Sequence, residues 1–291
     1  NQYGVKLFDQ NPDGHLLLIQ ESLLNKTFKN SKYTTFKIKE PKERLVFKLP
    51  YYPDRIIQHS IINILKPHFQ SWFTADTYAN IEGRGISAAD NAIKNALKDI
   101  PGTQFYLQID IRKYYPNIDH NILKSLIRKK IKDQDLLWLL DEIIDSAEGL
   151  PIGNYLSQYL ANYYLSGLDH WLKEVKRVKY YFRYADDLLI LAPTKEELHQ
   201  LRIDIEVYLR LQLNLEMKGN YRVWPTKIGI DTLGYIYFHT HTRLRKRIKK
   251  NFARAVAKKN PKKSTIAAYK GWAKRANTKN LLKKLLANEK F

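Results

Sequence analysis

Two apolar segments of this sequence carry aspartates at their ends, and they limit the folds that the chain can adopt. Residues 105–111 have the pattern of a buried strand and deliver Asp110, while residues 181–191 form two apolar stretches around Asp186 and Asp187. Burying a carboxylate among Ile, Leu and Phe is costly unless it is paired or binds a cation. The sequence therefore predicts a sheet that brings three carboxylates to one place.

Three neighbouring carboxylates repel one another unless a divalent cation lies between them, and their hard oxygen atoms suit Mg²⁺. Two such ions ~3.5–4 Å apart can activate a 3′-hydroxyl and stabilise a leaving pyrophosphate. The alternative is ordinary turn chemistry, because Asp-Asp is common at the tip of a hairpin. What favours the metal interpretation is the combination of both segments, in this order, with a basic module downstream.

The positive charge of the chain is concentrated at its C-terminal end. Residues 241–291 contain eighteen Lys and Arg but only Glu289 as an acid, so they carry +17 of the net +21. Apolar residues recur there at helical spacing in three groups, which predicts three amphipathic helices separated near Pro261 and Asn277. A folded basic surface of this kind most simply binds phosphate backbone. A charged tail is the alternative.

Composition excludes several other classes. The chain has no cysteine, so it has no disulfide framework, thiolate zinc site or catalytic thiol. No apolar run approaches the ~18 residues of a membrane helix, and we expect no membrane partner. The chain starts at Asn1 without Met or a signal pattern, and we expect it to be a fragment or a trimmed chain.

The order of the predicted elements mixes helices and strands without a regular βαβ period, so the predicted fold class is α+β. The periodicity predicts helices over 15–29, 54–69, 87–98, 119–130, 133–146, 153–175 and 195–211. It predicts strands over 33–38, 44–49, 105–111, 180–183, 188–192 and 232–238, with a turn at 40–43.

The block Tyr184-Ala185-Asp186-Asp187 resembles the signature of reverse transcriptases, and further blocks of that family match most of the chain, from about residue 16 to 290. The matching blocks lie at 44–50, 54–59, 78–85, 110–120, 150–158, 213–219 and 233–235. The resemblance implies a right-hand polymerase with fingers over 1–100, a catalytic palm with an antiparallel sheet over 101–240, and a basic helical thumb over 241–291. It implies RNA-directed DNA synthesis from dNTPs on a template RNA, with an RNA/cDNA duplex as product.

Two departures from the common pattern point to one branch of that family. Most reverse transcriptases have Gln where this chain has Ile152, and Pro where it has Gln158. This block, and the basic segment 268–277, are similar to reverse transcriptases of diversity-generating retroelements. That similarity implies copying of a template-repeat RNA with errors at adenines, a small oligomeric basic accessory protein as partner, and a cytoplasmic enzyme encoded by a bacterium or phage.

The resemblance also implies a role for individual residues. Asp110 and Asp186 would bind two Mg²⁺ ions, for which Mn²⁺ is a possible substitute, with help from the carbonyl of Ile111 and support from Asp187. Tyr115 would exclude a 2′-hydroxyl, although a packed core tyrosine is the alternative. The remaining nucleotide-binding candidates are Arg44, Lys48, Ile152, Gln158 and Lys218, the last as a proton donor to pyrophosphate.

The candidates for contact with nucleic acid are mostly cations of the thumb segment, with Arg84 from the fingers. They are Arg84, Arg243, Arg245, Arg247, Lys249, Lys250, Lys270, Trp272 and Lys274. Two other functions stay open: another bacterial reverse transcriptase, of group II intron, retron or abortive-infection type, and a catalytically silent RNA-binding scaffold. We further expect Ile152 to lower fidelity, because a branched apolar side chain cannot make the hydrogen bonds of a glutamine amide.

Overall fold

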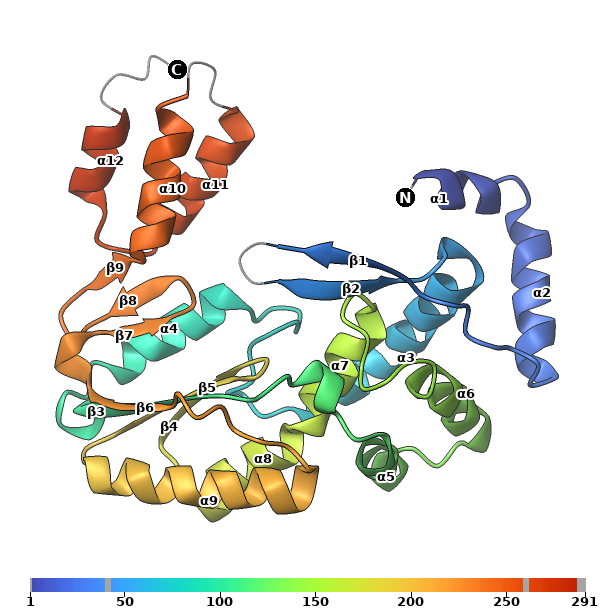
Figure 1. The fold of residues 1–291 in the computed structure, drawn as a ribbon, viewed down its shortest axis with the longest axis horizontal. Coiled ribbons are helices and arrows are strands. Elements are labelled where there is room, and N and C mark those ends of the chain that lie inside the picture. Colours follow the sequence, from blue (N-terminus) through green and yellow to red (C-terminus); the bar gives the residue numbers. More distant parts are fainter. Residues whose placement is uncertain (1, 40–42, 259–261, 287–291) are drawn as a thin grey trace.

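The structure is a computed structural model that describes residues 2–39, 43–258 and 262–286. The predicted turn at 40–43 falls largely outside these residues, as do Pro261 and Glu289. The described residues form helices around three antiparallel sheets (Figure 1). None of the described helices has the length and apolar character needed to span a membrane.

The N-terminal part combines helices with a two-stranded hairpin. Its elements are α1 (Gln2–Phe8), α2 (Pro12–Leu24), β1 (Thr34–Ile38), β2 (Arg44–Lys48), a π-helical turn (Tyr51–Arg55), α3 (Ile56–Trp72) and α4 (Ile86–Ala96). The helix predicted over 15–29 starts earlier, because the Asn11 side chain caps it and Pro12 occupies its first turn. Strands β1 and β2 pair from Thr34 with Lys48 to Ile38 with Arg44, close to the predicted strands.

A four-stranded antiparallel sheet occupies the centre of the molecule, in the strand order β4-β5-β3-β6. Its strands are β3 (Phe105–Asp110), β4 (Tyr180–Tyr184), β5 (Asp187–Ala192) and β6 (Arg222–Pro225). Three of the four match predicted strands, whereas β6 was not predicted. The predicted α+β class with an antiparallel palm sheet is confirmed.

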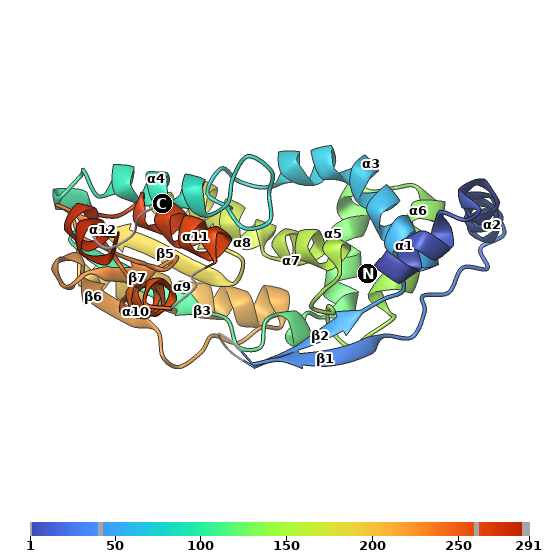
Figure 2. The same cartoon turned by 90° about the horizontal axis from the view of Figure 1, so that it is seen from above.

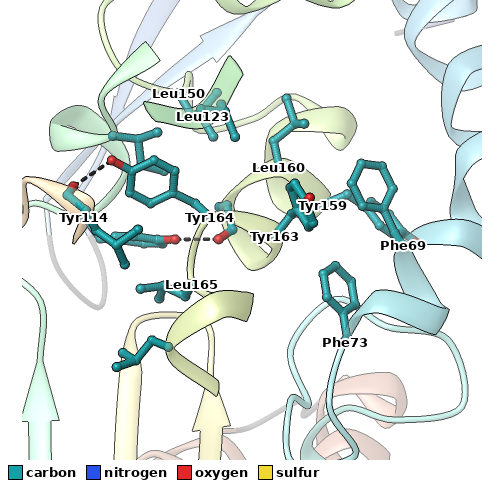
Figure 3. Packing of buried hydrophobic residues seen from close by; sticks show 14 of the residues in the cluster. Phe69, Phe73, Tyr114, Leu123, Leu150, Tyr159, Leu160, Tyr163, Tyr164 and Leu165 are labelled. Carbon is teal, nitrogen blue, oxygen red and sulfur yellow. Dashed lines mark hydrogen bonds between the residues drawn. The ribbon is translucent and has the colours of Figure 1, made fainter. Parts of the chain in front are cut away.

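The two faces of this sheet contribute to two different cores, because successive side chains of a strand point to opposite faces. Leu107, Ile109 and Ile190 belong to the larger core, which α5 to α9 share. Tyr106, Leu189 and Leu191 belong to a second core with α4, the β7–β9 sheet and the last helices. Figure 3 shows the larger core around α7, where Tyr164 donates a hydrogen bond of 2.6 Å to the Leu213 carbonyl.

The helices of the larger core are α5 (His120–Lys130), α6 (Gln134–Ile144), α7 (Tyr155–Tyr164), α8 (Ser166–His170) and α9 (Lys195–Leu213). The prediction of one helix over 153–175 is wrong. The segment breaks after Tyr164, where the Ser166 hydroxyl donates to the Tyr163 carbonyl at 2.7 Å, and it ends in a π-helical turn, Trp171–Val175. A side-chain hydroxyl that bonds a nearby carbonyl competes with the regular helical ladder.

The single strand predicted over 232–238 is also wrong, because it spans a hairpin. Strands β7 (Ile230–Thr232) and β8 (Tyr235–Tyr237) pair with each other around Leu233 and Gly234, which both have positive φ. Strand β9 (Thr242–Leu244) then pairs with β8 to complete a three-stranded sheet. Positive φ at two successive residues reverses the chain, and alternation alone does not reveal it.

The last described segment forms the three helices predicted from its apolar spacing: α10 (Lys246–Val256), α11 (Lys263–Ala273) and α12 (Lys279–Leu286). They stand together above the β7–β9 sheet in Figure 1. Phe252 of α10 is buried and stacks on Tyr269 of α11 at 5.2 Å between ring centroids. Asn277 joins this bundle to β9, because its backbone and side chain both bond the backbone of Thr242.

Candidate active site

The three aspartates predicted to act together lie at the same end of the four-stranded sheet. Asp110 is the last residue of β3 and Asp187 is the first of β5, and the two residues pair directly across the strands. Asp186 lies in the turn between β4 and β5, whose flanking residues Tyr184 and Asp187 pair with each other. The turn closes because Ala185 adopts φ +56°. The structure therefore places both sequence segments at one site.

Asp110 has an incomplete set of partners. Its Oδ2 atom forms an ion pair with the ammonium group of Lys218, whose backbone N–H also donates to the Asp110 carbonyl at 2.9 Å. Its Oδ1 atom is buried and has no hydrogen-bond partner within the described structure. An unpaired buried carboxylate oxygen is costly, so this atom marks a place for a positively charged or donating group.

The carboxyl group of Asp186 is buried close to a second carboxylate, that of Asp110. Burial raises the pKa of Asp186 above its usual value, the carboxylate of Asp110 raises it further, and Lys218 and Arg44 oppose the rise. In the described parts of the chain, no three His, Asp or Glu side chains are gathered closely enough to hold a metal ion. Asp187 is exposed, and Ile111 is buried in an antiparallel bridge with Met217.

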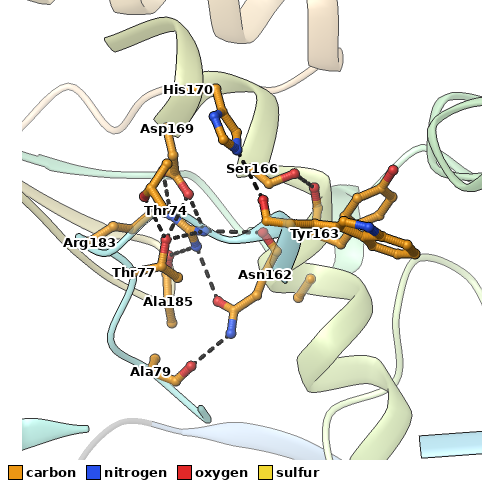
Figure 4. A network of polar contacts seen from close by, with 12 residues as sticks. Thr74, Thr77, Ala79, Asn162, Tyr163, Ser166, Asp169, His170, Arg183 and Ala185 are labelled. Atoms are coloured by element: carbon orange, nitrogen blue, oxygen red, sulfur yellow. Dashed lines mark hydrogen bonds and ion pairs between the residues drawn. The ribbon is translucent and has the colours of Figure 1, made fainter. Parts of the chain in front are cut away.

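A buried polar network contacts the turn at Ala185 (Figure 4). Arg183 is fully buried and donates from Nε and Nη2 to the two carboxylate oxygens of Asp169, at 2.7 and 2.6 Å. Its Nη1 donates to the carbonyl of Ala185 at 3.0 Å and to the side chain of Asn162 at 3.1 Å. Burial alone would lower the pKa of Arg183, but the Asp169 carboxylate raises it, so the guanidinium stays charged.

A cleft of about 660 Å³ opens in front of the paired aspartates. The palm sheet contributes Asp110, Asp187 and Gln108 to its lining, and the β7–β8 turn contributes Leu233 and Gly234. Arginines from separate parts of the chain also line it: Arg44, Arg222, Arg245 and Arg247, while the fully buried Arg183 borders it from β4. The cleft therefore has carboxylates at the strand ends and arginines along its walls, one of which, Arg245, is paired with Asp231 of the same lining.

The predicted nucleotide-binding residues divide into two groups. Arg44 lines the cleft, and Tyr115 lies near Asp186, since burial and the charge of Asp186 raise the pKa of Tyr115 to about 12. The ammonium group of Lys218 forms an ion pair with the carboxylate of Asp110. The other five, Lys48, Tyr115, Ile152, Gln158 and Lys218, are absent from the cleft lining formed by the described residues.

Ile152 connects the loop before α7 to strand β2. Its carbonyl accepts a hydrogen bond of 2.7 Å from the backbone N–H of Phe47 in β2. The next residue, Gly153, has φ +124°, and a Cβ atom there would lie 2.4 Å from the Phe47 carbonyl oxygen. Glycine is therefore required for the close approach of the two backbones. The result is a fixed position for Ile152 beside the strand that carries Arg44.

The predicted nucleic-acid contacts occupy several environments. Arg84 donates to the carbonyls of Thr74 and Thr77, at 2.5 and 2.9 Å, and so braces the loop between α3 and α4. Arg245 pairs with Asp231 at 2.6 Å, and the Trp272 ring lies 5.4 Å from that of Tyr235, between their centroids. The exposed cations of this group are Arg243, Arg247, Lys249, Lys250 and Lys274, while Lys270 is half-buried.

Sequence reasoning missed Arg183 and Arg222. The signal for Arg183 was a charged residue inside the apolar strand Tyr180–Tyr184, which requires a buried partner. The signal for Arg222 was weaker, because the strand Arg222–Pro225 is short and ends in proline. Both residues line the cleft.

The arrangement of a central antiparallel sheet, carboxylates at its strand ends and a helical bundle across a cleft defines a right-hand polymerase fold. Solved structures agree. The chain is similar to telomerase from Candida albicans in complex with a TWJ fragment of telomeric RNA, with a TM-score of 0.52 at 10% identity over 94% of this chain and 61% of that one. It is also similar to apo telomerase from Candida tropicalis, with a TM-score of 0.57 at 10% identity over 90% and 60% of the two chains.

The sequence gives a more specific assignment. Residues 31–220, more than half of the chain, match the family model of reverse transcriptase (RNA-dependent DNA polymerase). The chain belongs to this family. It is 24% identical to protein YkfC of Escherichia coli over 72% of this chain and 65% of that protein. It is 27% identical to the group II intron-encoded protein LtrA of Lactococcus lactis over 47% of this chain and 24% of that protein. The chain thus spans less than two thirds of each of these relatives.

Proposed function

We propose that this chain is an RNA-directed DNA polymerase that adds deoxynucleotides to a primer on an RNA template. The observation that carries the proposal is the pairing of Asp110 with Asp187 beside Asp186, at the end of a cleft in a chain of the reverse transcriptase family. In the proposed division, residues 1–100 are the fingers, 101–240 the palm and 241–291 the thumb. Support comes from the sheet in the second segment and the helices α10 to α12 in the third.

The carboxylates fit a divalent cation. The buried Oδ1 atom of Asp110 lacks a partner, and the pKa of Asp186 is raised by burial and by Asp110, so added positive charge would stabilise both groups. We assign Asp110 and Asp186 as the ligands of two Mg²⁺ ions, or of Mn²⁺ in their place, with the Ile111 carbonyl and Asp187 in support. When bound, such ions activate a 3′-hydroxyl and neutralise the charge of the leaving pyrophosphate.

The cations and the aromatic ring around the carboxylates suit a nucleoside triphosphate. Arg44 is positioned to hold phosphate oxygens, for which a guanidinium offers paired donors. With its pKa raised to about 12, Tyr115 remains an uncharged phenol at neutral pH. We assign its ring the role of excluding a 2′-hydroxyl. Lys218, which forms an ion pair with Asp110, is the proposed proton donor to pyrophosphate. Lys48 and Gln158 are also assigned to nucleotide binding.

The basic residues of the thumb segment are proposed to hold the template–primer duplex. Arg245 and Arg247 line the cleft, and Lys249 and Lys250 are exposed on α10. The other proposed contacts are Arg84, Arg243, Lys270, Trp272 and Lys274. Neutralising phosphates releases counterions, so binding should weaken steeply with salt, and each lysine removed should reduce the slope by about 1.

Within the family, we infer a reverse transcriptase of a diversity-generating retroelement. The inference rests on Ile152 in place of glutamine, on the block that follows it and on the basic segment 268–277. It includes copying of a template-repeat RNA with errors at adenines, an oligomeric basic accessory protein as partner, and a cytoplasmic location.

Primer extension on a defined RNA template tests the proposed activity. The wild-type chain should extend a primer with Mg²⁺ and dNTPs, and Asp186→Ala should not extend it. Equal behaviour of the two proteins would favour a silent RNA-binding scaffold. Sequencing of the cDNA then tests the subtype, because accurate copying opposite adenine would indicate another bacterial reverse transcriptase, of group II intron, retron or abortive-infection type.

A further inference from the structure

Strand β6 forms the open edge of the palm sheet and carries an unusual set of side chains. In the described structure β6 pairs with β3 on one side only, and it lies below the β7–β9 sheet in Figure 1. Tyr221 is 37% exposed and Trp224 is 46% exposed, which is a large apolar area for a sheet edge. No acidic residue occurs between Met217 and Ile230, whereas Lys218, Arg222 and Lys227 do.

Each exposed ring of this edge is covered by an arginine. The guanidinium of Arg222 lies over the Trp224 ring at 5.2 Å from its centroid, and that of Arg202 lies over the Tyr221 ring at 4.9 Å. The two pairs lie on opposite sides of the sheet: Arg222 and Trp224 are opposite Gln108 and Tyr106, whereas Arg202 belongs to α9, which packs with Leu107 and Ile109 on the other face. Only the Arg222–Trp224 pair lies on the face of the cleft.

The register shows how this pair relates to the catalytic end. Arg222 is opposite Gln108 and Trp224 is opposite Tyr106, on the same face of the sheet as Asp110. Since β6 runs antiparallel to β3, the row from Arg222 to Trp224 leads away from Asp110. Asn220 and Arg222 line the cleft, and Trp224 continues the row beyond it. The row is therefore an extension of the cleft along the sheet edge.

We infer that the Arg222–Trp224 pair is a binding surface for single-stranded nucleic acid that continues from the cleft. An exposed ring beside cations is the combination that binds single strands without sequence preference, because bases stack on the ring and phosphates contact the arginine. The inference rests on the proposed function for its choice of ligand. A protein strand that pairs with the open edge of β6 would use backbone groups and would not require the Trp224 ring.

Binding of labelled oligonucleotides, measured by fluorescence anisotropy without dNTPs, tests the inference. The substrates are a blunt RNA/DNA hybrid and the same hybrid with a single-stranded overhang of about eight nucleotides, within the site size of such surfaces. One arm places the overhang on the RNA strand and another on the DNA strand, which identifies the strand that is bound.

The variant Trp224→Ala should weaken binding of an overhang substrate by about five- to a hundredfold, the range for loss of one stacked base, and should leave the blunt hybrid unchanged. Trp224→Phe keeps a ring and should retain most of the affinity. Arg222→Ala should weaken the same substrate and reduce the salt slope by about 1. Tyr221→Ala is the matched control, because it removes an arginine-covered ring directly before β6 on the side of α9, and it should change binding of neither substrate.

Three results would overturn the inference: no effect of Trp224→Ala, equal losses for Trp224→Ala and Tyr221→Ala, or an equal loss on the blunt hybrid. Thermal unfolding of each variant separates a lost contact from a lost fold, and Trp224→Phe keeps the test valid if Trp224→Ala unfolds. This binding assay does not depend on catalysis. If the chain binds overhang substrates through Trp224 but fails to extend primers, the polymerase proposal is rejected and the proposed binding surface stands.

Discussion

The guanidinium of Arg183 donates a hydrogen bond of 3.0 Å to the carbonyl of Ala185, the residue that begins the turn before Asp186. Ala185 has φ +56°, a conformation that disfavours a residue with a side chain and needs support from its surroundings. The same guanidinium forms a fully buried ion pair with Asp169. The position of a predicted metal ligand thus depends on a charge pair beneath the sheet.

We expect Arg183→Met to reduce the free energy of unfolding by about 3–5 kcal/mol, because it leaves the Asp169 carboxylate buried without its partner. Chemical denaturation measures the change. Arg202→Met is a suitable control, since Arg202 pairs with the half-exposed Glu206 and such pairs contribute about 0.3–0.5 kcal/mol. Equal losses in the two variants would show that the buried pair has no special role.

A second expectation concerns Asp186 in the metal-free protein. Burial raises its pKa above the usual 3.8, so the folded state holds the proton more tightly than the unfolded state. The stability that this group contributes is therefore complete below pH 3.8 and is lost as the pH rises through the raised pKa. Asp186→Asn should make the chelator-treated protein more stable than wild type at pH 7, and the difference should vanish in acid.

Urea unfolding at several pH values, in the presence of a chelator, measures this difference. Asp187→Asn serves as the control, because Asp187 is exposed and its neutralisation should have a smaller effect. A less stable Asp186→Asn protein at pH 7 would contradict the expectation. Primer extension by Asp186→Asn should be lost in either case, since the amide removes a proposed metal ligand.

The close contact of Gly153 with β2 leads to a third expectation. Gly153→Ala places a Cβ atom 2.4 Å from the Phe47 carbonyl oxygen at φ +124°, so the backbone must shift. We expect a loss of about 1–3 kcal/mol in stability and a higher KM for dNTPs, because β2 carries Arg44. Gly271→Ala is the control: it has open space on α11 and should gain about 0.5–1 kcal/mol. Unchanged KM and stability in Gly153→Ala would contradict the expectation.

The sequence predicted that the three aspartates lie at one end of the sheet, because β3 and β5 are apolar strands with aspartates at their ends, and both signals are local. The partners of Arg183 were not predictable, because Asp169 and Asn162 come from a segment that reads as one regular helix. The break after Tyr164 depends on a Ser166 hydroxyl bond that periodicity does not reveal.

The same limitation applies to the sheets. Alternation identifies strands, but it does not show where residues of positive φ reverse the chain. The sequence therefore predicted one strand where the structure has a hairpin around Gly234. In the folded chain this glycine accommodates Trp272, since a Cβ atom there would lie 2.5 Å from the Trp272 ring. Strand β6 has too few residues for a periodic signal, and its pairing with β3 decides its structure.

The ion pair between Lys218 and Asp110 leads to a fourth expectation. A lysine on this carboxylate competes with a divalent cation, so Lys218→Met should tighten Mn²⁺ binding by up to about fivefold, the equivalent of a half-exposed ion pair. Isothermal titration with Mn²⁺ measures the change. Arg112→Met is the control. It removes a cation that lies two residues after Asp110 and pairs with the exposed Glu216, two residues before Lys218. Weaker Mn²⁺ binding by Lys218→Met would show that the lysine supports the site instead.

The last expectation concerns fidelity and Ile152. The bond of 2.7 Å between the Ile152 carbonyl and the Phe47 N–H fixes the backbone of this residue, so a substitution changes the side chain without moving the loop. Ile152→Gln supplies an amide that can bond the incoming nucleotide, and we expect fewer errors opposite template adenine. Ile152→Leu keeps an apolar side chain of the same size and should leave the error rate high. Deep sequencing of the cDNA measures both rates, and equal misincorporation by Ile152→Gln and wild type would rule out a role for Ile152 in fidelity.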